Sequence, residues 1–162
     1  MKILITLFLV LFLSSCSHKN AFSEFDMNGS QELSITSLKR IKITKDTQTV
    51  GAFNAIYLNE VYPKIYNGDE YFFVYIYLKE MQEISDPNTK NDDKLILTLN
   101  DNRPIKLKIL QAENRFSNLS SSKNKWNQYY LVSFATEEKK LTLKLESDLS
   151  SSVSLSYQKD QQ

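Results

Sequence analysis

From about residue 33 onward, apolar and polar residues alternate along the chain. Successive side chains of a β-strand point to opposite faces, so this period of two predicts strands with one face in a core and the other in water. The strand-like groups are Leu33/Ile35, Ile41/Ile43, Leu95/Leu97/Leu99, Ile105/Leu107/Ile109, Leu141/Leu143/Leu145 and Val153/Leu155/Tyr157.

One segment breaks the alternation because both of its phases are apolar. Residues 71–78 read YFFVYIYL, which predicts a central strand buried on both sides. Residues 52–62, which end at a proline, and residues 129–134 complete the expected strands. The turn-forming residues 100–104 (NDNRP) predict a hairpin that joins 95–99 to 105–109.

The spacing of these segments predicts an all-β domain over residues 32–162, with about seven to eight short strands. The pattern resembles an immunoglobulin-like or a transthyretin-like β-sandwich, and it does not choose between them. No convincing amphipathic helix interrupts it, although a short helical turn at 112–119 is compatible with the sequence. Two longer loops are expected, at 79–94 and 113–127.

The first sixteen residues, MKILITLFLVLFLSSC, have a different character. Lys2 precedes an apolar run over 3–13, which is too short for a helix that crosses a hydrocarbon core of roughly 30 Å. The run predicts a signal peptide over residues 1–15. It ends in Leu13-Ser14-Ser15-Cys16, which resembles the lipobox of bacterial lipoproteins.

The resemblance implies that Cys16 is the lipidation site and the first residue of the mature protein. Each buried methylene contributes about 0.8 kcal/mol, so two or more acyl chains hold a protein stably on a membrane. Residues 16–31 are then the tether, and Ser17 favours sorting to the outer membrane of the cell envelope. A plain membrane helix, or an unmodified cysteine, is the alternative interpretation.

The charge balance narrows the choice of partners. The chain has 20 Lys and Arg against 19 Asp and Glu, and loss of Lys2 with the signal peptide leaves 19 of each. Without a concentrated basic segment, the sequence argues against a nucleic-acid partner. Cys16 is the only cysteine, which excludes an internal disulfide and the disulfide-bonded antibody type of domain.

The sequence offers little catalytic chemistry. His18 is the only histidine and lies in the tether, so neither a catalytic triad nor a zinc site is expected around it. Asp86, Asp92 and Asp93 crowd one loop without the spacing of a calcium loop and are best explained as solvated charges. Asp69 and Glu70 lead from a predicted turn into the central strand, and adjacent residues of a strand point to opposite faces, so the two carboxylates are poorly placed to share a substrate. We therefore expect no catalytic residues, no cofactor and no metal site.

The aromatic residues of the central strand are the main candidate for an interaction surface. Tyr71, Phe73, Tyr75 and Tyr77 share one face of that strand, and the aliphatic face belongs to the core. The aromatic face is either covered by the protein's own loops and by Tyr57, Tyr62 and Tyr66, or it docks another envelope protein.

Three functions are compatible with these features. The preferred hypothesis is a lipid-anchored, non-enzymatic envelope lipoprotein that acts as a binding or assembly-accessory module. The alternative is a protein that binds a small ligand or a cell-wall glycan on its tyrosines. A hydrolase that uses carboxylates of the 79–94 loop is the weakest of the three.

Overall fold

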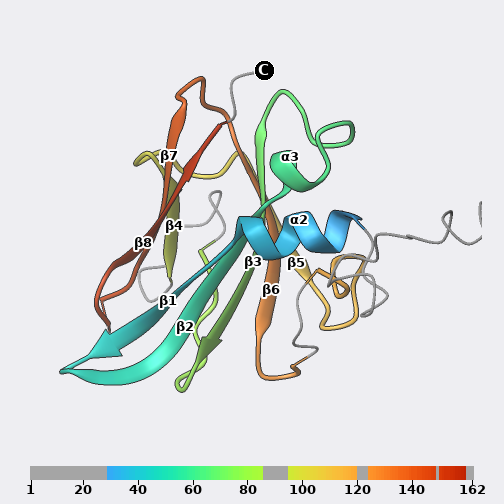
Figure 1. Cartoon of the computed structure of the whole chain (residues 1–162). Coiled ribbons are helices and arrows are strands. Elements are labelled where there is room, and N and C mark those ends of the chain that lie inside the picture. Colours follow the sequence, from blue (N-terminus) through green and yellow to red (C-terminus); the bar gives the residue numbers. More distant parts are fainter. Residues whose placement is uncertain (1–28, 86–94, 120–123, 149, 160–162) are drawn as a thin grey trace, which may run out of the picture.

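The computed structural model describes residues 29–85, 95–119, 124–148 and 150–159, and within them the chain forms two antiparallel sheets that face each other (Figure 1). The first sheet has five strands in the order β1-β2-β3-β6-β5, and the second has three in the order β4-β7-β8. The fold is therefore the all-β sandwich that the alternation predicts. The predicted signal peptide, Cys16, His18 and residues 16–28 of the tether lie outside the described residues.

The elements follow one another along the chain with two short helices among the strands. They are α2 (Gly29–Ser37), β1 (Leu38–Lys45), β2 (Gln48–Tyr57), α3 (Leu58–Val61), β3 (Glu70–Leu78), β4 (Ile96–Leu99), β5 (Lys106–Leu110), β6 (Gln128–Phe134), β7 (Lys140–Glu146) and β8 (Val153–Gln158).

Seven of the strands have the order of a constant-type immunoglobulin domain. The set β2-β3-β6-β5 opposite β4-β7-β8 corresponds to strands ABED opposite CFG of that sandwich. Strand β1 is an addition at the edge, paired with β2 across a two-residue turn. Both turn residues, Asp46 and Thr47, have positive φ, as a type I′ hairpin turn requires.

The main core lies between the two sheets and takes the aliphatic phase of β3, as predicted. Tyr157 of β8 joins the sheets, because its hydroxyl donates to the Ala55 carbonyl at 2.7 Å and its ring lies 5.3 Å from that of Phe72. Burial raises the pKa of the Tyr157 hydroxyl. The buried side chains of this core from the two sheets include Ile43, Phe53, Ala55, Tyr57, Phe72, Val74, Ile76, Tyr130, Val132, Phe134, Leu97, Leu99, Leu141, Leu143, Leu145, Val153, Leu155 and Tyr157.

A second hydrophobic cluster covers the outer face of the five-stranded sheet. Phe73, Tyr75 and Tyr129 supply the sheet side of this cluster, and α3 together with the successive turns of 112–119 supplies the cover. Helix α2 packs beside α3, and Ser34 Oγ donates to the Leu119 carbonyl at 3.3 Å. Helices and turns thus replace solvent on this face, with the helices in front of the sheet in Figure 1.

The prediction of a strand that begins at residue 33 is wrong, because residues 29–37 are helical. Ser34 and Ser37, three residues apart on the helix, are buried against the protein, where Ser37 Oγ donates to the Glu60 carboxylate. Leu33 and Ile35 are exposed instead. Their alternation resembled a strand, but the contacts that hold this segment are the serine hydrogen bonds to α3 and to the 112–119 turns.

Two further expectations also need correction. The segment predicted as a strand over 52–62 ends at Tyr57 and continues as α3.

The turn at Asn100 and Asp101 exists, with both residues at positive φ, but it does not join paired strands. Strand β4 pairs with β7 and β5 pairs with β6, so the chain crosses between the sheets here. Asn100 secures the turn to β7 by accepting a hydrogen bond from the Thr142 amide at 2.7 Å.

The two-sided burial of β3 leads to a stability prediction. Phe73→Ala should lower the free energy of unfolding by about 3–5 kcal/mol, because Phe73 is fully enclosed between the sheet and its cover. Tyr77→Ala, on the same face of the same strand but 39% exposed, should cost about 1 kcal/mol or less. Urea unfolding of both variants checks this; equal losses would contradict a closed cover over Phe73.

Candidate functional site

The predicted aromatic interaction face is not an open docking surface. Phe73 and Tyr75 are buried, Tyr71 is half-buried, and only Tyr77 at the end of β3 is substantially exposed. The Phe116 ring lies 5.1 Å from that of Phe73. The physical reason is that two apolar faces on one strand require two covering layers, and the protein supplies both.

The Tyr66 ring packs against Tyr71. The two ring centroids lie 4.9 Å apart, and Arg115 Nη2 donates to the Tyr66 hydroxyl at 2.6 Å. Burial raises the pKa of that hydroxyl against the lowering effect of the Arg115 charge. The Arg115 guanidinium also lies 4.7 Å from the centre of the Phe116 ring. Of the tyrosines considered as cover, Tyr57 lies on the other face, in the main core.

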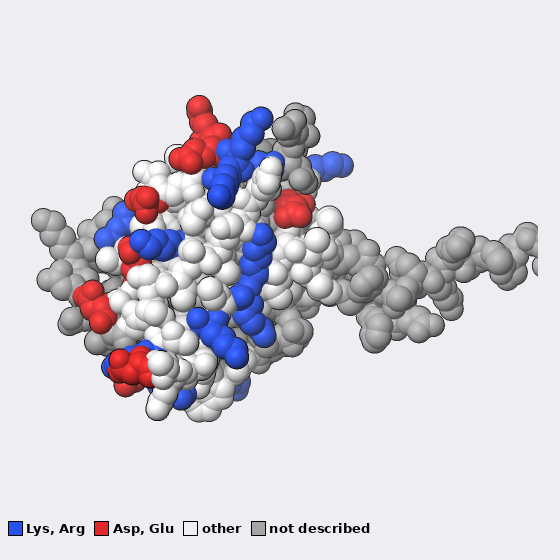
Figure 2. Space-filling view, turned by 60° about the vertical axis from the view of Figure 1, so that its left-hand side comes forward, with Lys and Arg blue, Asp and Glu red and all other residues white. Residues whose placement is uncertain are grey.

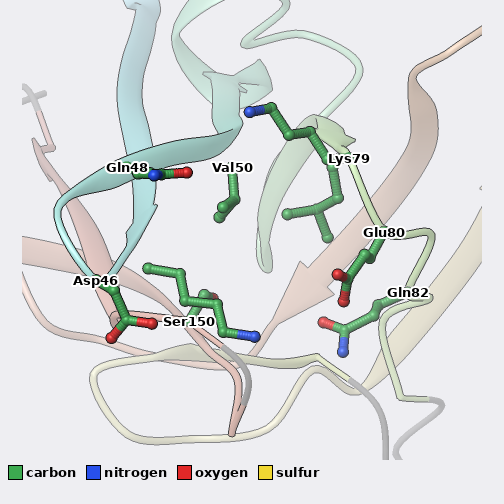
Figure 3. A pocket seen from close by; sticks show the side chains of 9 residues that line it. Asp46, Gln48, Val50, Lys79, Glu80, Gln82 and Ser150 are labelled. Atoms are coloured by element: carbon green, nitrogen blue, oxygen red, sulfur yellow. The ribbon is translucent and has the colours of Figure 1, made fainter.

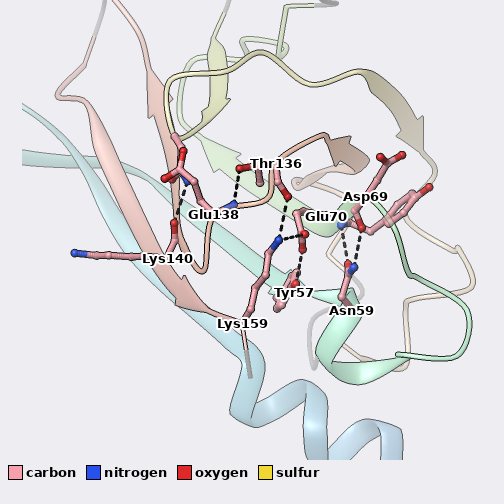
Figure 4. A network of polar contacts seen from close by, with 10 residues as sticks. Tyr57, Asn59, Asp69, Glu70, Thr136, Glu138, Lys140 and Lys159 are labelled. Atoms are coloured by element: carbon pink, nitrogen blue, oxygen red, sulfur yellow. Dashed lines mark hydrogen bonds and ion pairs between the residues drawn. The ribbon is translucent and has the colours of Figure 1, made fainter. Parts of the chain in front are cut away.

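A polar cleft opens where β2 and β8 end and β3 begins (Figure 4). Its volume is about 470 Å³. It contains Glu70, the first residue of β3, whose carboxylate is almost completely buried. The cleft is lined by Tyr57, Asn59, Glu60, Pro63, Tyr66, Asn67, Gly68, Glu70, Gln158 and Lys159.

Both oxygens of the Glu70 carboxylate are engaged. Lys159 Nζ lies 2.5 Å from Oε1, and the Tyr57 hydroxyl donates to Oε2. The same lysine donates to the Thr136 carbonyl at 3.0 Å, so the end of β8 is fastened to β3 and to the β6–β7 connection. A carboxylate held in this way by a cation and a hydroxyl is suited to bracing the sandwich.

Asn59 braces the adjacent turn. Its Nδ2 donates to the Asp69 carbonyl at 2.7 Å, and its Oδ1 accepts from the Tyr71 amide at 2.8 Å. The side chains with room to meet a ligand in this cleft are therefore its exposed or half-exposed members, Glu60, Asn67 and Gln158. Their amides and carboxylate would suit a polar, hydroxyl-rich ligand.

Sequence reasoning missed the role of Glu70, although a signal existed. Glu70 falls on the same phase as Phe72 and Val74, which face the main core. A carboxylate on that phase must be buried beside a cation or at the end of the strand. Its partner, Lys159, is 89 residues away, and spacing along the chain does not identify such a pair.

A second cleft lies at the opposite end of β2 and β3 (Figure 3). Its volume is about 370 Å³. Figure 3 shows Val50 pointing into it and Glu80 and Gln82 on its far wall. Val50 and Leu78 also pack against the main core, so they form an apolar floor beneath a polar rim. The remaining lining residues are Lys45, Asp46, Gln48, Lys79 and Ser150.

Exposed apolar side chains also occur along the free edge of the five-stranded sheet. We define the β5 edge as residues 105–109, the end of the sheet beyond β6. Ile109 is 61% exposed, and Ile105, just before the strand, is 48% exposed. The opposite sheet has three strands against five, so the inner side of β5 receives less cover than that of β3.

On the face shown in Figure 2, charge does not mark a site for a single class of partner. Figure 2 shows lysine and arginine side chains alongside aspartate and glutamate on the side that lies to the left in Figure 1. Among the described residues, no three His, Cys, Asp or Glu side chains come together as metal ligands. The predicted cluster of Asp86, Asp92 and Asp93 lies outside the described residues.

No family model, curated protein or solved structure matches this chain. Within the part of the chain that the structure describes, no helix is both long enough and apolar enough to span a bilayer.

The Glu70 ion pair leads to a test of the cleft. Lys159→Met should lower the free energy of unfolding by about 2–3 kcal/mol, because it leaves a buried carboxylate without its cation. Adding Glu70→Gln should recover part of this loss, since a neutral amide still accepts from Tyr57. The matched control is Lys144→Met, which breaks the solvent-accessible pair with Glu146 and should lower the stability much less. Chemical unfolding of the three variants measures their order of stability. A double variant that is less stable than Lys159→Met would contradict this role for Glu70.

Proposed function

We propose that this chain is a lipid-anchored, non-enzymatic binding module of the bacterial cell envelope, whose β-sandwich holds another envelope protein near the membrane. The observation that carries the binding role is the β5 edge, where Ile105 and Ile109 are exposed and no strand of the described residues pairs with the far side of β5. Exposed apolar groups on a sheet edge are a frequent basis for recognition between proteins.

The anchoring role rests on the lipobox-like sequence that ends at Cys16. Gly29, where α2 begins, follows Cys16 by 13 residues. An extended chain covers about 3.4 Å per residue, so such a tether holds the domain within about 45 Å of the lipid. Ser17 favours the outer membrane as the site of anchoring. A partner in the same membrane, or in the layer next to it, would be within reach.

Replacement of the anchoring cysteine tests this proposal. Cys16→Ala should move the protein from the membrane fraction to the soluble fraction without changing its unfolding midpoint, because the proposed lipid attaches at Cys16. Cell fractionation and metabolic labelling with a fatty acid measure the two effects. Ser17→Ala is the matched control and should remain lipidated. A Cys16→Ala protein that stays in membranes would refute the anchor.

A small polar ligand, such as a cell-wall glycan, is a second candidate function. The cleft beside Glu70 favours it, because amide and carboxylate side chains converge there over about 470 Å³. The tyrosine stacking platform of the sequence hypothesis does not carry this alternative, since Phe73 and Tyr75 are buried.

A thermal-shift titration with soluble peptidoglycan fragments tests the second candidate. Millimolar fragments should raise the melting temperature of the unaltered protein if they bind the folded state. Gln158→Ala should abolish that rise, and Gln48→Ala in the opposite cleft should retain it. The absence of a shift for the unaltered protein, or equal shifts in both variants, would remove this candidate.

A further inference from the structure

The free side of β5 has the composition of a strand that accepts another strand. β5 is the last strand of its sheet, and within the described residues no strand pairs with its far side. Leu107 faces the main core and pairs with Val132 of β6, and Ile109 follows on the same phase beside Tyr130. This phase is apolar, and its cover diminishes toward Ile109.

The opposite phase of the strand begins with two basic residues and ends at Leu110, which packs against the second hydrophobic cluster. Lys106 and Lys108 are exposed, and neither has an ion-pair partner among the described residues. Edge lysines commonly discourage unwanted pairing of strands. Here Lys108 is next to Ile109, an apolar side chain that is 61% exposed, and a strand that was only protected from pairing would have no use for it. The combination favours selective pairing.

A second copy of the chain does not satisfy this pattern. If two β5 strands paired antiparallel about their midpoint, Lys108 of one copy would lie opposite Lys108 of the other. Like charges directly opposite each other destabilise a pair of strands. A partner strand with acidic side chains on one face and apolar side chains on the other would complement both faces of β5.

We propose that β5 is a strand-addition site for an extended segment of a partner protein, in which acidic residues alternate with apolar ones. The backbone of the segment bonds to the free edge of β5. Its apolar side chains lie beside Leu107 and Ile109, and its carboxylates lie beside Lys106 and Lys108. The inference rests on the proposed binding function and names the partner's chemistry.

Peptides of defined pattern test the site on the full-length chain in detergent micelles. The probe is a fluorescent nine-residue peptide that alternates glutamate with valine. One control peptide has lysine in place of glutamate, and another has the same composition with its glutamates grouped at one end. Fluorescence anisotropy at low ionic strength should show binding of the alternating acidic peptide, with the two control peptides at least roughly tenfold weaker.

Variants of β5 separate this site from general attraction to positive charge. Lys106→Glu/Lys108→Glu should weaken the binding of the acidic peptide at least roughly tenfold and should confer binding of the lysine peptide. Ile109→Asp should weaken the acidic peptide as well. Lys42→Glu/Lys125→Glu changes the net charge equally at exposed positions elsewhere and should leave the affinity unchanged.

Two outcomes would overturn the inference: no binding of the acidic peptide at millimolar concentration, or equal weakening by the charge-matched control. Either failure is distinguishable from failure of the proposed function. A protein that copurifies with the crosslinked lipoprotein, and still does so with Lys106→Glu/Lys108→Glu, would retain the binding function and refute β5 as its site. Loss of membrane association in Cys16→Ala tests the lipid anchor and is independent of the binding function and of the β5 site.

Discussion

The rest of the structure depends on the burial of β3 on both of its faces. A strand with apolar side chains on both phases gains stability only where each face is removed from water. The three-stranded sheet covers one face, with Tyr157 reaching across to Ala55 and Phe72. Among the described residues no third sheet is present to cover the other face. The helices and the 112–119 turns take that position, and the aromatic side chains of β3 become a second core.

The same constraint places a charge at the start of β3. Glu70 lies on the inward phase, so its carboxylate leaves water when the sandwich closes. Lys159 and Tyr57 offset the loss of hydration, and because they come from β2 and from the end of β8, they bind the two sheets together at one end. The cleft beside them is polar because Tyr57, Glu70 and Lys159 are among the residues that line it. The cleft therefore lies next to a buried carboxylate because that carboxylate helps to hold the two sheets together.

Function is consequently left to the ends and edges of the sandwich. Both faces of the central strand are occupied, and β1 is joined to the β7–β8 connection through the hydrogen bond from the Ser151 amide to the Thr44 carbonyl at 2.8 Å. That contact reduces the accessibility of one side of the five-stranded sheet. The other side ends at β5, where Ile109 is exposed next to Lys108. A lipid-anchored module of this shape would present β5 to its partner while the tether leaves from α2.

Much of the architecture follows from local alternation. The period of two determined the strands, and the two apolar phases of residues 71–78 identified the central strand and the face that meets the opposite sheet. The same rule failed at Leu33 and Ile35, where two apolar residues in alternation lie on a helix held by Ser34 and Ser37. It also failed at Asn100, where turn chemistry specified a reversal but not the partner of either strand.

The lipobox-like sequence at Cys16 is a prediction from local sequence and stays so. The sequence by itself determined where most of the strands form and which of their phases are apolar, because both depend on residues that are neighbours along the chain. Only the tertiary structure decided that Tyr71, Phe73 and Tyr75 are covered, that Glu70 meets Lys159, and that β5 is an edge. Those outcomes depend on contacts between segments tens of residues apart, and strand order determines which segments meet.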